Sequence, residues 1–97
     1  MFSSRLKSEQ ADNLARAILA LNTEEDCYKL FEDLFTIREI QDMSQRLTVA
    51  HMLDRGDSYV SIQERTGASA TTISRVSKAL NYGADGYLNV LKKLDFS

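Results

Sequence analysis

A single glycine separates two short amphipathic segments between Tyr59 and Leu80, and this pattern constrains the fold more than any other in the chain. Apolar residues recur three and four positions apart on both sides of Gly67, which is the spacing of a helix face. Gly67 suits the left-handed backbone of a short turn, and Ser69 can cap the next helix by accepting a hydrogen bond from a free backbone N–H. The sequence therefore predicts a helix, a tight turn and a second helix. The expected inward positions are Ile62, Thr66, Ile73, Val76 and Leu80.

The outward face of the second helix carries hydroxyl and cationic side chains and no acid. These side chains belong to Thr71, Thr72, Ser74, Arg75 and Lys78. Short hydroxyl groups let a helix approach base edges closely, an arginine can donate two hydrogen bonds to guanine, and a lysine suits phosphate. The pattern predicts a helix-turn-helix that binds double-stranded DNA. The alternative is a solvated helix, although serine and threonine have poor helix propensity and gain little from exposure alone.

Composition favours one small helical domain. The chain has 97 residues, 43% hydrophobic and 27% charged, with no proline and four glycines. Its net charge of −2 opposes nucleic-acid binding, because non-specific affinity comes mainly from phosphate neutralisation. The charge is unevenly distributed, however: residues 23–33 hold five acids and one lysine, whereas residues 60–81 hold three cations and one acid. Because salt screens fields beyond roughly 8 Å, a local basic face can act despite distant acids.

Apolar periodicity predicts six helices joined by short connections. The expected helices cover residues 11–21, 23–35, 36–55, 58–66, 69–81 and 85–95. Expected caps are Thr23, Thr36 with Glu39 as a capping box, Asp57 or Ser58, and Asp85. The chain is thus expected to be an all-helical single domain over residues 1–97. Residues 11–55 would form dimerisation helices, residues 58–81 the helix-turn-helix and residues 85–95 a C-terminal helix.

The amphipathic helices of residues 11–55 have more apolar surface than a small DNA reader covers alone, which favours a homodimer with interlocking helices. A two-fold dimer would present two recognition helices to successive major grooves, roughly 34 Å apart, and so read palindromic sites. A monomeric six-helix bundle remains the alternative.

The sequence gives little support to a membrane protein, an enzyme or a metal site. No apolar run approaches the roughly 20 residues that span a bilayer, and residues 1–10 lack the apolar core of a signal peptide, so a cytoplasmic protein is expected. Cys27 falls in an apolar helical stripe, which predicts a buried thiol without a disulfide. His51 has no neighbouring residue at a spacing that implies an activated nucleophile, and one His with one Cys cannot make a tetrahedral site without carboxylates. We therefore expect neither catalysis nor a bound metal.

Residues 30–94 resemble the bacterial Trp repressor family, and in particular its Trp-repressor-like branch of regulators. The resemblance rests on the stretch LFTIREIQDMSQRLTVAHMLDRGDSYVSIQERTGASATTISRVSKAL. In the family, an Arg-Gly pair closes the long helix, as at residues 55–56, and the recognition helix contains a Thr-Ile-Thr-Arg run, matched by TISR at residues 72–75. The resemblance implies an intertwined all-helical dimer that binds an operator and represses transcription.

The resemblance also implies two sets of site residues. The DNA-contacting positions that the resemblance implies are Gln63, Ser69, Ala70, Thr71, Thr72, Ser74 and Arg75. The charge pattern adds Lys78 as an eighth position. The corepressor pocket of the family would correspond to Thr36, Arg46 and Arg75. Two guanidinium groups could flank an indole ring or clasp a carboxylate.

The matching pocket departs from the family at two positions. The family has a glycine directly after the recognition-helix arginine, where this chain has Val76, and a serine that faces the ligand's amino group, where this chain has Ala79. Overpacking costs about 1–3 kcal/mol and a lost hydrogen bond roughly 0.5–1.5 kcal/mol. Thr36 is also explained as a cap, and Arg46 could pair with Asp42 one turn earlier. No cofactor is certain from the sequence. It favours an effector other than L-tryptophan or none, and control by L-tryptophan is the alternative.

A helix-turn-helix that docks on protein partners in transcription or replication is the competing function. Substitution of Arg75 distinguishes the two functions, because a protein-docking role should survive it and DNA recognition should not.

Overall fold

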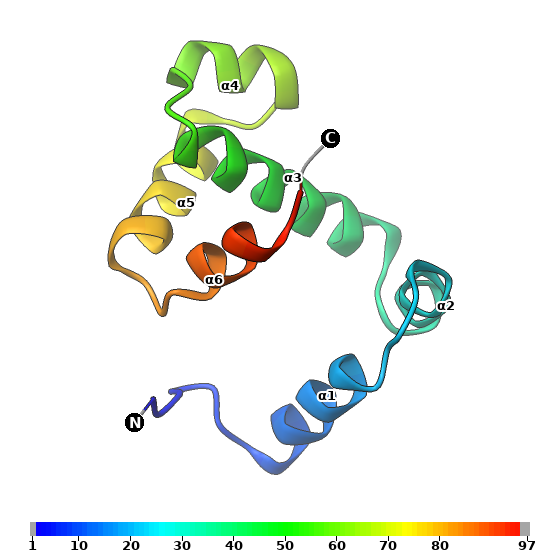
Figure 1. Cartoon of the computed structure of the whole chain (residues 1–97). Coiled ribbons are helices and arrows are strands. Elements are labelled where there is room, and N and C mark those ends of the chain that lie inside the picture. Colours follow the sequence, from blue (N-terminus) through cyan, green and yellow to red (C-terminus); the bar gives the residue numbers. More distant parts are fainter. Residues whose placement is uncertain (1, 96–97) are drawn as a thin grey trace. The chain divides into compact units, whose positions relative to one another are not determined.

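The computed structural model describes residues 2–95, and within that range it contains six helices and no strand (Figure 1). The predicted all-helical class is confirmed. The helices are α1 (Glu9–Leu19), α2 (Glu24–Leu34), α3 (Ile37–Asp54), α4 (Tyr59–Thr66), α5 (Ala70–Tyr82) and α6 (Gly86–Lys93). They form two compact units, Met1–Thr36 and Ile37–Ser97. Within residues 2–95, every helix is too short or too polar to cross a membrane.

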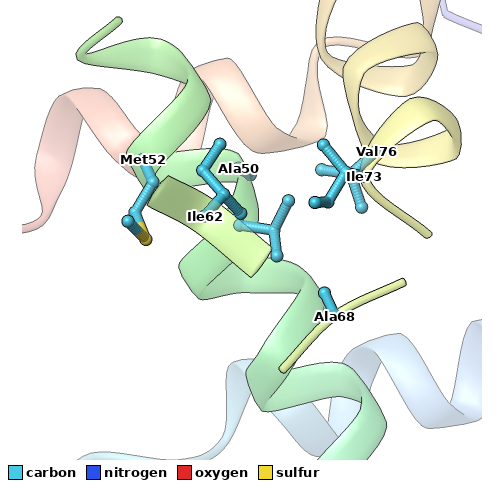
Figure 2. Close-up of a cluster of buried hydrophobic side chains, with 7 residues drawn as sticks. Ala50, Met52, Ile62, Ala68, Ile73 and Val76 are labelled. Atoms are coloured by element: carbon cyan, nitrogen blue, oxygen red, sulfur yellow. The ribbon is translucent and has the colours of Figure 1, made fainter. Parts of the chain in front are cut away.

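Helix α3 is the centre of the second unit, where α4, α5 and α6 all pack against it and α5 also contacts α4 and α6. Figure 2 shows the side chains of α3, α4 and α5 gathered in one cluster. Its buried members are Val49, Ala50, Met52, Ile62, Ala68, Ile73 and Val76, and Leu53, Tyr87 and Leu91 pack against them. The positions of α4 and α5 that were expected to face inward are confirmed as buried, except for Thr66, which is half-buried.

The connection between α4 and α5 is fixed by its local chemistry. Gly67 has a φ of 73°, in the left-handed region, and its N–H donates to the Gln63 carbonyl at 2.9 Å. The Ser69 Oγ accepts from the Thr72 N–H at 3.1 Å, which caps α5 as expected. At the start of α4, Ser58 is the cap, because its Oγ accepts from the Ser61 N–H at 3.2 Å. Each helix of the pair therefore begins at a satisfied cap.

An ion pair closes the turn between α3 and α4. Arg55 Nη2 lies 2.7 Å from Asp57 Oδ2, and Arg55 Nε donates to the same oxygen at 2.8 Å. The hydrogen bond from Arg55 lowers the pKa of Asp57 below its ordinary 3.8. Partial burial opposes this shift, while the positive charges of Arg55, Arg65 and His51 add to it. Gly56 has a φ of 92° and makes the bend between the two partners.

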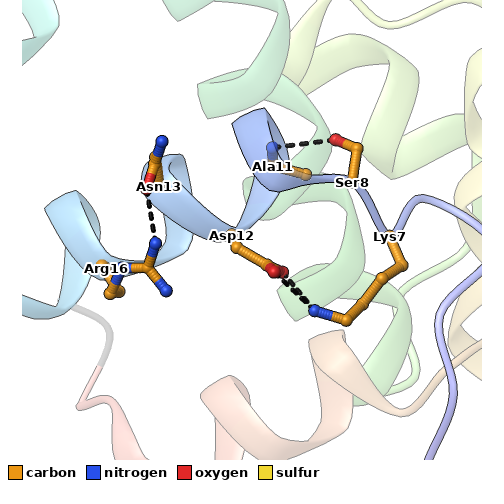
Figure 3. Close-up of polar contacts among 6 residues, drawn as sticks. All are labelled: Lys7, Ser8, Ala11, Asp12, Asn13 and Arg16. Carbon is orange, nitrogen blue, oxygen red and sulfur yellow. Dashed lines mark hydrogen bonds and ion pairs between the residues drawn. The ribbon is translucent and has the colours of Figure 1, made fainter.

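In the first unit, α1 begins two residues earlier than expected. The Ser8 Oγ accepts from the Ala11 N–H at 3.0 Å, and this cap sets the start of the helix at Glu9 (Figure 3). Lys7 Nζ lies 2.5 Å from Asp12 Oδ2 and holds the same turn. The helix ends at Leu19 rather than at the expected residue 21.

The apolar stripes of α1 and α2 remain accessible. Neither helix has a buried residue, and Leu14 and Ile18 of the α1 stripe are each 43% exposed. On α2, Phe31 packs edge-to-face against Tyr28 and Phe35. The expectation of a buried Cys27 thiol is wrong here, because the side chain is only half-buried. No residue of α2 is fully buried, so the sulfur is only partly covered.

One predicted cap is not formed. Asp85 precedes α6, but its side chain accepts no hydrogen bond from that helix. Asp85 adopts a left-handed backbone with a φ of 67°, whereas a capping residue normally has an extended backbone that aims its side chain at the free N–H groups. Tyr87 and Leu91 pack against the core, so α6 is held by burial rather than by a cap.

We expect Gly67→Ala to lower the free energy of unfolding by about 1–2 kcal/mol, the cost of a left-handed backbone for a residue with a Cβ. A Cβ at this position meets no atom within 4 Å, so the loss reports backbone conformation and not a clash. Gly86→Ala is the matched control: its Cβ also meets open space, and stability should be unchanged or slightly raised. Urea unfolding measures the stability of both variants. Equal losses of unfolding free energy would contradict the left-handed backbone of Gly67 as the cause.

The Arg55–Asp57 pair predicts a pH-dependent contribution to stability. Because the folded pKa of Asp57 is lowered, its contribution is fully present above the unfolded value of 3.8 and disappears as the pH falls through the folded value. A double-mutant cycle with Arg55→Met and Asp57→Asn should therefore show coupling at neutral pH that vanishes in acid. Urea unfolding over a pH series measures the coupling energy. A coupling energy that does not change with pH would show that the Arg55–Asp57 ion pair is not its source.

Candidate nucleic-acid interface

Helix α5 has two chemically distinct faces. Ile73, Val76 and Leu80 are buried against the rest of the second unit. Five residues on the opposite side are exposed and line one shallow, open hollow of about 400 Å³: Ala70, Thr71, Ser74, Arg75 and Lys78. Their spacing of one, four, five and eight positions from the first residue is that of a single helix face. The structure thus brings together five of the eight residues predicted to contact DNA.

The other three predicted residues lie outside this set: one is on α4 and two are at the start of α5. Gln63 is exposed on α4. Ser69 is exposed and Thr72 half-buried, and their hydroxyl groups are 3.1 Å apart, with Ser69 donating. Because Ser69 also accepts from the Thr72 N–H, these two side chains define the first turn of α5. Ser69 and Thr72 therefore have a structural role at the start of α5, whether or not they also contact a ligand.

The two cations of α5 are available to a partner. Within residues 2–95, no hydrogen bond or ion pair joins Arg75 or Lys78 to another residue, and α5 itself contains no Asp or Glu. Some cations elsewhere are paired: Lys29, for example, lies 3.8 Å from Glu25. The exposed face of α5 therefore keeps its positive charge.

Two residues that position the interface were not identified from the sequence. Gln45 on α3 donates from its Nε2 to the Thr66 carbonyl at 3.1 Å, across 21 positions of the chain. The Thr66 hydroxyl donates to the Ile62 carbonyl at 2.7 Å and accepts from the Ala68 N–H at 3.1 Å. Together they attach the end of α4 and the following turn to α3. Thr66 was assigned only to the apolar stripe, and a glutamine on a helix surface gives no sequence signal of a distant carbonyl partner.

The residues expected to hold an effector are distributed over both units. Thr36 is the last residue of the first unit, whereas Arg46 on α3 and Arg75 on α5 belong to the second. Both arginines are exposed. The suggested pairing of Arg46 with Asp42 is wrong, because Asp42 instead lies 3.7 Å from Arg38 Nε. Arg38 and Arg46 each stand one turn from Asp42, on opposite sides along the helix, and the side-chain conformation decides between them.

Metal-binding side chains do not gather in the described range. No three His, Cys, Asp or Glu side chains of residues 2–95 lie close enough together to hold a metal ion. His51 is half-buried on α3. The exposed face of α5 is therefore the strongest candidate site.

Comparison with known proteins identifies the family of the chain. The sequence profile of the family described as Trp repressor protein matches residues 9–95. The chain is 48% identical over 90 residues to YerC of Bacillus subtilis, a protein of uncharacterised function, and the match covers 93% of this chain and 86% of YerC.

Two crystal structures have closely similar folds. A Staphylococcus aureus protein assigned to the Trp repressors superposes with a TM-score of 0.87 at 45% identity, covering 92% of this chain and 89% of that one. A TrpR-like protein from Eubacterium eligens superposes with a TM-score of 0.88 at 47% identity, covering 92% of each chain. The family is one of DNA-binding regulators of transcription rather than of enzymes. The chain belongs to the Trp repressor family.

Proposed function

We propose that this protein is a sequence-specific transcriptional repressor that reads a palindromic operator as a homodimer. The observation that carries the proposal is the exposed face of α5, where hydroxyl groups and two unpaired cations stand opposite a buried apolar face. A helix with this division can enter the major groove without disturbing its own packing.

Each residue type on this face suits a particular contact. Arg75 can donate two hydrogen bonds to O6 and N7 of a guanine, which is worth about 1–3 kcal/mol of discrimination against other bases. Ala70 offers a methyl group that fits against the methyl of thymine. Lys78 lies one turn after Ser74, away from the start of the helix, and suits a phosphate. The face therefore combines base reading with backbone contacts.

The apolar surface of the first unit supports a homodimer. Leu14, Ile18 and Leu34 are exposed on α1 and α2, and exposed apolar stripes on consecutive helices are typical of an interface. A second copy of the chain offers the same surface, as a two-fold interface requires. Such a dimer would present two α5 helices to one side of a duplex.

The net charge of −2 predicts modest non-specific affinity, so that specific contacts supply most of the discrimination. Two cations per subunit on the reading face give a salt dependence that is weaker than that of strongly basic DNA-binding proteins. Binding should therefore be measured at low and at physiological ionic strength.

Selection of bound sequences from a random duplex pool tests the proposal directly. We expect enrichment of a palindrome with half-sites about one helical turn apart, and a dimer by sedimentation equilibrium. Enrichment of no sequence at any ionic strength would refute DNA reading. A monomer that binds a single half-site would refute only the dimer.

Arg75→Ala should weaken binding to the selected duplex by about 1–3 kcal/mol and relax the base preference at one position of each half-site. Lys78→Ala should weaken all duplexes alike and reduce the slope of log K against log salt by about 1 for each phosphate that Lys78 neutralises. Lys93→Ala is the matched control, since Lys93 lies on α6 and not on the α5 face. Fluorescence anisotropy titrations measure all three, and wild-type affinity of the Arg75 variant would instead favour a protein-docking role.

Ser69→Ala should lower the free energy of unfolding by about 0.5–2 kcal/mol, because it removes the cap of α5. Ser69→Asp should keep the stability, since aspartate also caps, but weaken duplex binding because a negative charge then faces the phosphates. Ser8→Asp makes the same change at the cap of α1 and should leave duplex binding unchanged. If Ser69→Asp bound duplex as well as the wild type, Ser69 would lie outside the interface.

A further inference from the structure

We propose that Tyr82, the last residue of α5, binds the phosphate backbone of the duplex just beyond the major groove. This inference rests on the proposed function and extends its DNA contacts by one turn along the same helix. An aromatic residue interrupts the pattern of hydroxyl and cationic side chains from which the α5 face was predicted, so Tyr82 was not among the predicted contacts.

Tyr82 continues the exposed face of α5. It follows Arg75 by seven positions and Lys78 by four, which is the spacing of side chains that lie on one side of a helix. Tyr82 is 86% exposed, whereas Tyr87 packs against the core. Among the described residues 2–95, none makes a hydrogen bond, ion pair or ring contact with Tyr82. The ring therefore adds little to folding, and its hydroxyl group is available to a partner.

The backbone around Tyr82 is held in place at the end of α5. The Gly83 N–H donates to the Ala79 carbonyl at 2.9 Å, and Asn81 Nδ2 donates to the Ser77 carbonyl at 2.9 Å. A Cβ at Gly83 would clash with the Ala79 carbonyl oxygen, so only glycine fits directly after Tyr82. The chain then turns toward α6 (Figure 1) and leaves the ring uncovered. The last turn of α5 thus presents Tyr82 on an ordered backbone.

The length of α5 places Tyr82 outside the major groove. Helix α5 has 13 residues, and at 1.5 Å per residue Thr71 and Tyr82 are about 16 Å apart along the axis. The major groove is about 12 Å wide, and the first residues of a recognition helix lie against the base edges. With Thr71 in the groove, Lys78 is about 10 Å further along and reaches the edge of the groove. Tyr82, another turn along, then lies over the sugar-phosphate backbone.

A tyrosine side chain suits this position. Its hydroxyl group can donate to a phosphate oxygen, and its apolar ring can pack on the carbons of a deoxyribose. Because the donor carries no charge, it displaces no counterion and its contribution changes little with salt. Such a contact adds affinity in a chain whose net charge is −2 and whose α5 face has only two cations.

Two substitutions test the contact in anisotropy titrations of the selected duplex with the full chain. Tyr82→Phe removes only the hydroxyl group and should raise Kd about three- to tenfold, and Tyr82→Ala should raise it further. The slope of log K against log salt should stay at the wild-type value in both variants. Tyr28→Phe is the matched control, because Tyr28 is also exposed but lies on α2, and its Kd should be unchanged. Wild-type affinity of Tyr82→Ala would overturn the proposal.

A modified duplex distinguishes a phosphate contact from an indirect effect. Single phosphates that flank each half-site are replaced in turn by an uncharged methylphosphonate, and both wild type and Tyr82→Phe are titrated. We expect one position at which the replacement weakens the wild type but not the variant. Equal losses for the two proteins at every position would overturn the phosphate contact.

Stability and assembly of the Tyr82 variants provide the second check. Melting temperatures and sedimentation equilibrium should match those of the wild type, because the ring makes no contact within the described chain. A weakened duplex Kd accompanied by a lower melting temperature or a dissociated dimer would overturn a direct contact. Failure of the wild type to bind any duplex would refute the proposed function together with this inference. Duplex binding that is insensitive to Tyr82→Ala would refute this inference alone.

Discussion

The inner face of α5 contributes Ile73 and Val76 to a core that also takes Val49 from α3 and Ile62 from α4. Fully burying such a side chain stabilises a protein by about 1.5–3 kcal/mol, so these few residues dominate the stability of the second unit. Because a helix has 3.6 residues per turn, burying residues 73 and 76 necessarily turns residues 74, 75 and 78 outward. The same packing therefore holds the domain together and turns outward the face that we propose reads DNA.

This arrangement separates stability from recognition. The exposed residues of α5 make few contacts within the chain, so the side chains at positions 71, 74, 75 and 78 can differ between related regulators at little cost to the fold. Ser69 is the exception, because the same hydroxyl caps the helix and stands at the edge of the face. The charges are also separated along the chain. Residues 23–33 hold five acids, whereas α5 holds no acid and its two cations are unpaired.

The exposed stripes of α1 and α2 are the surfaces on which a partner would matter most, because they are apolar and the described chain does not cover them.

The sequence alone determined the helix-turn-helix, because the signals for it are local. Apolar spacing identified the buried Ile62, Ile73 and Val76, a glycine marked the left-handed turn, and a serine marked the cap of α5. Only the tertiary structure decided contacts between distant residues, such as that of Gln45 with Thr66. It also decided between equivalent partners, since Asp42 lies one turn from two arginines and contacts only Arg38. Such choices depend on the distances between folded elements and on side-chain conformation, which residue spacing along a chain does not encode.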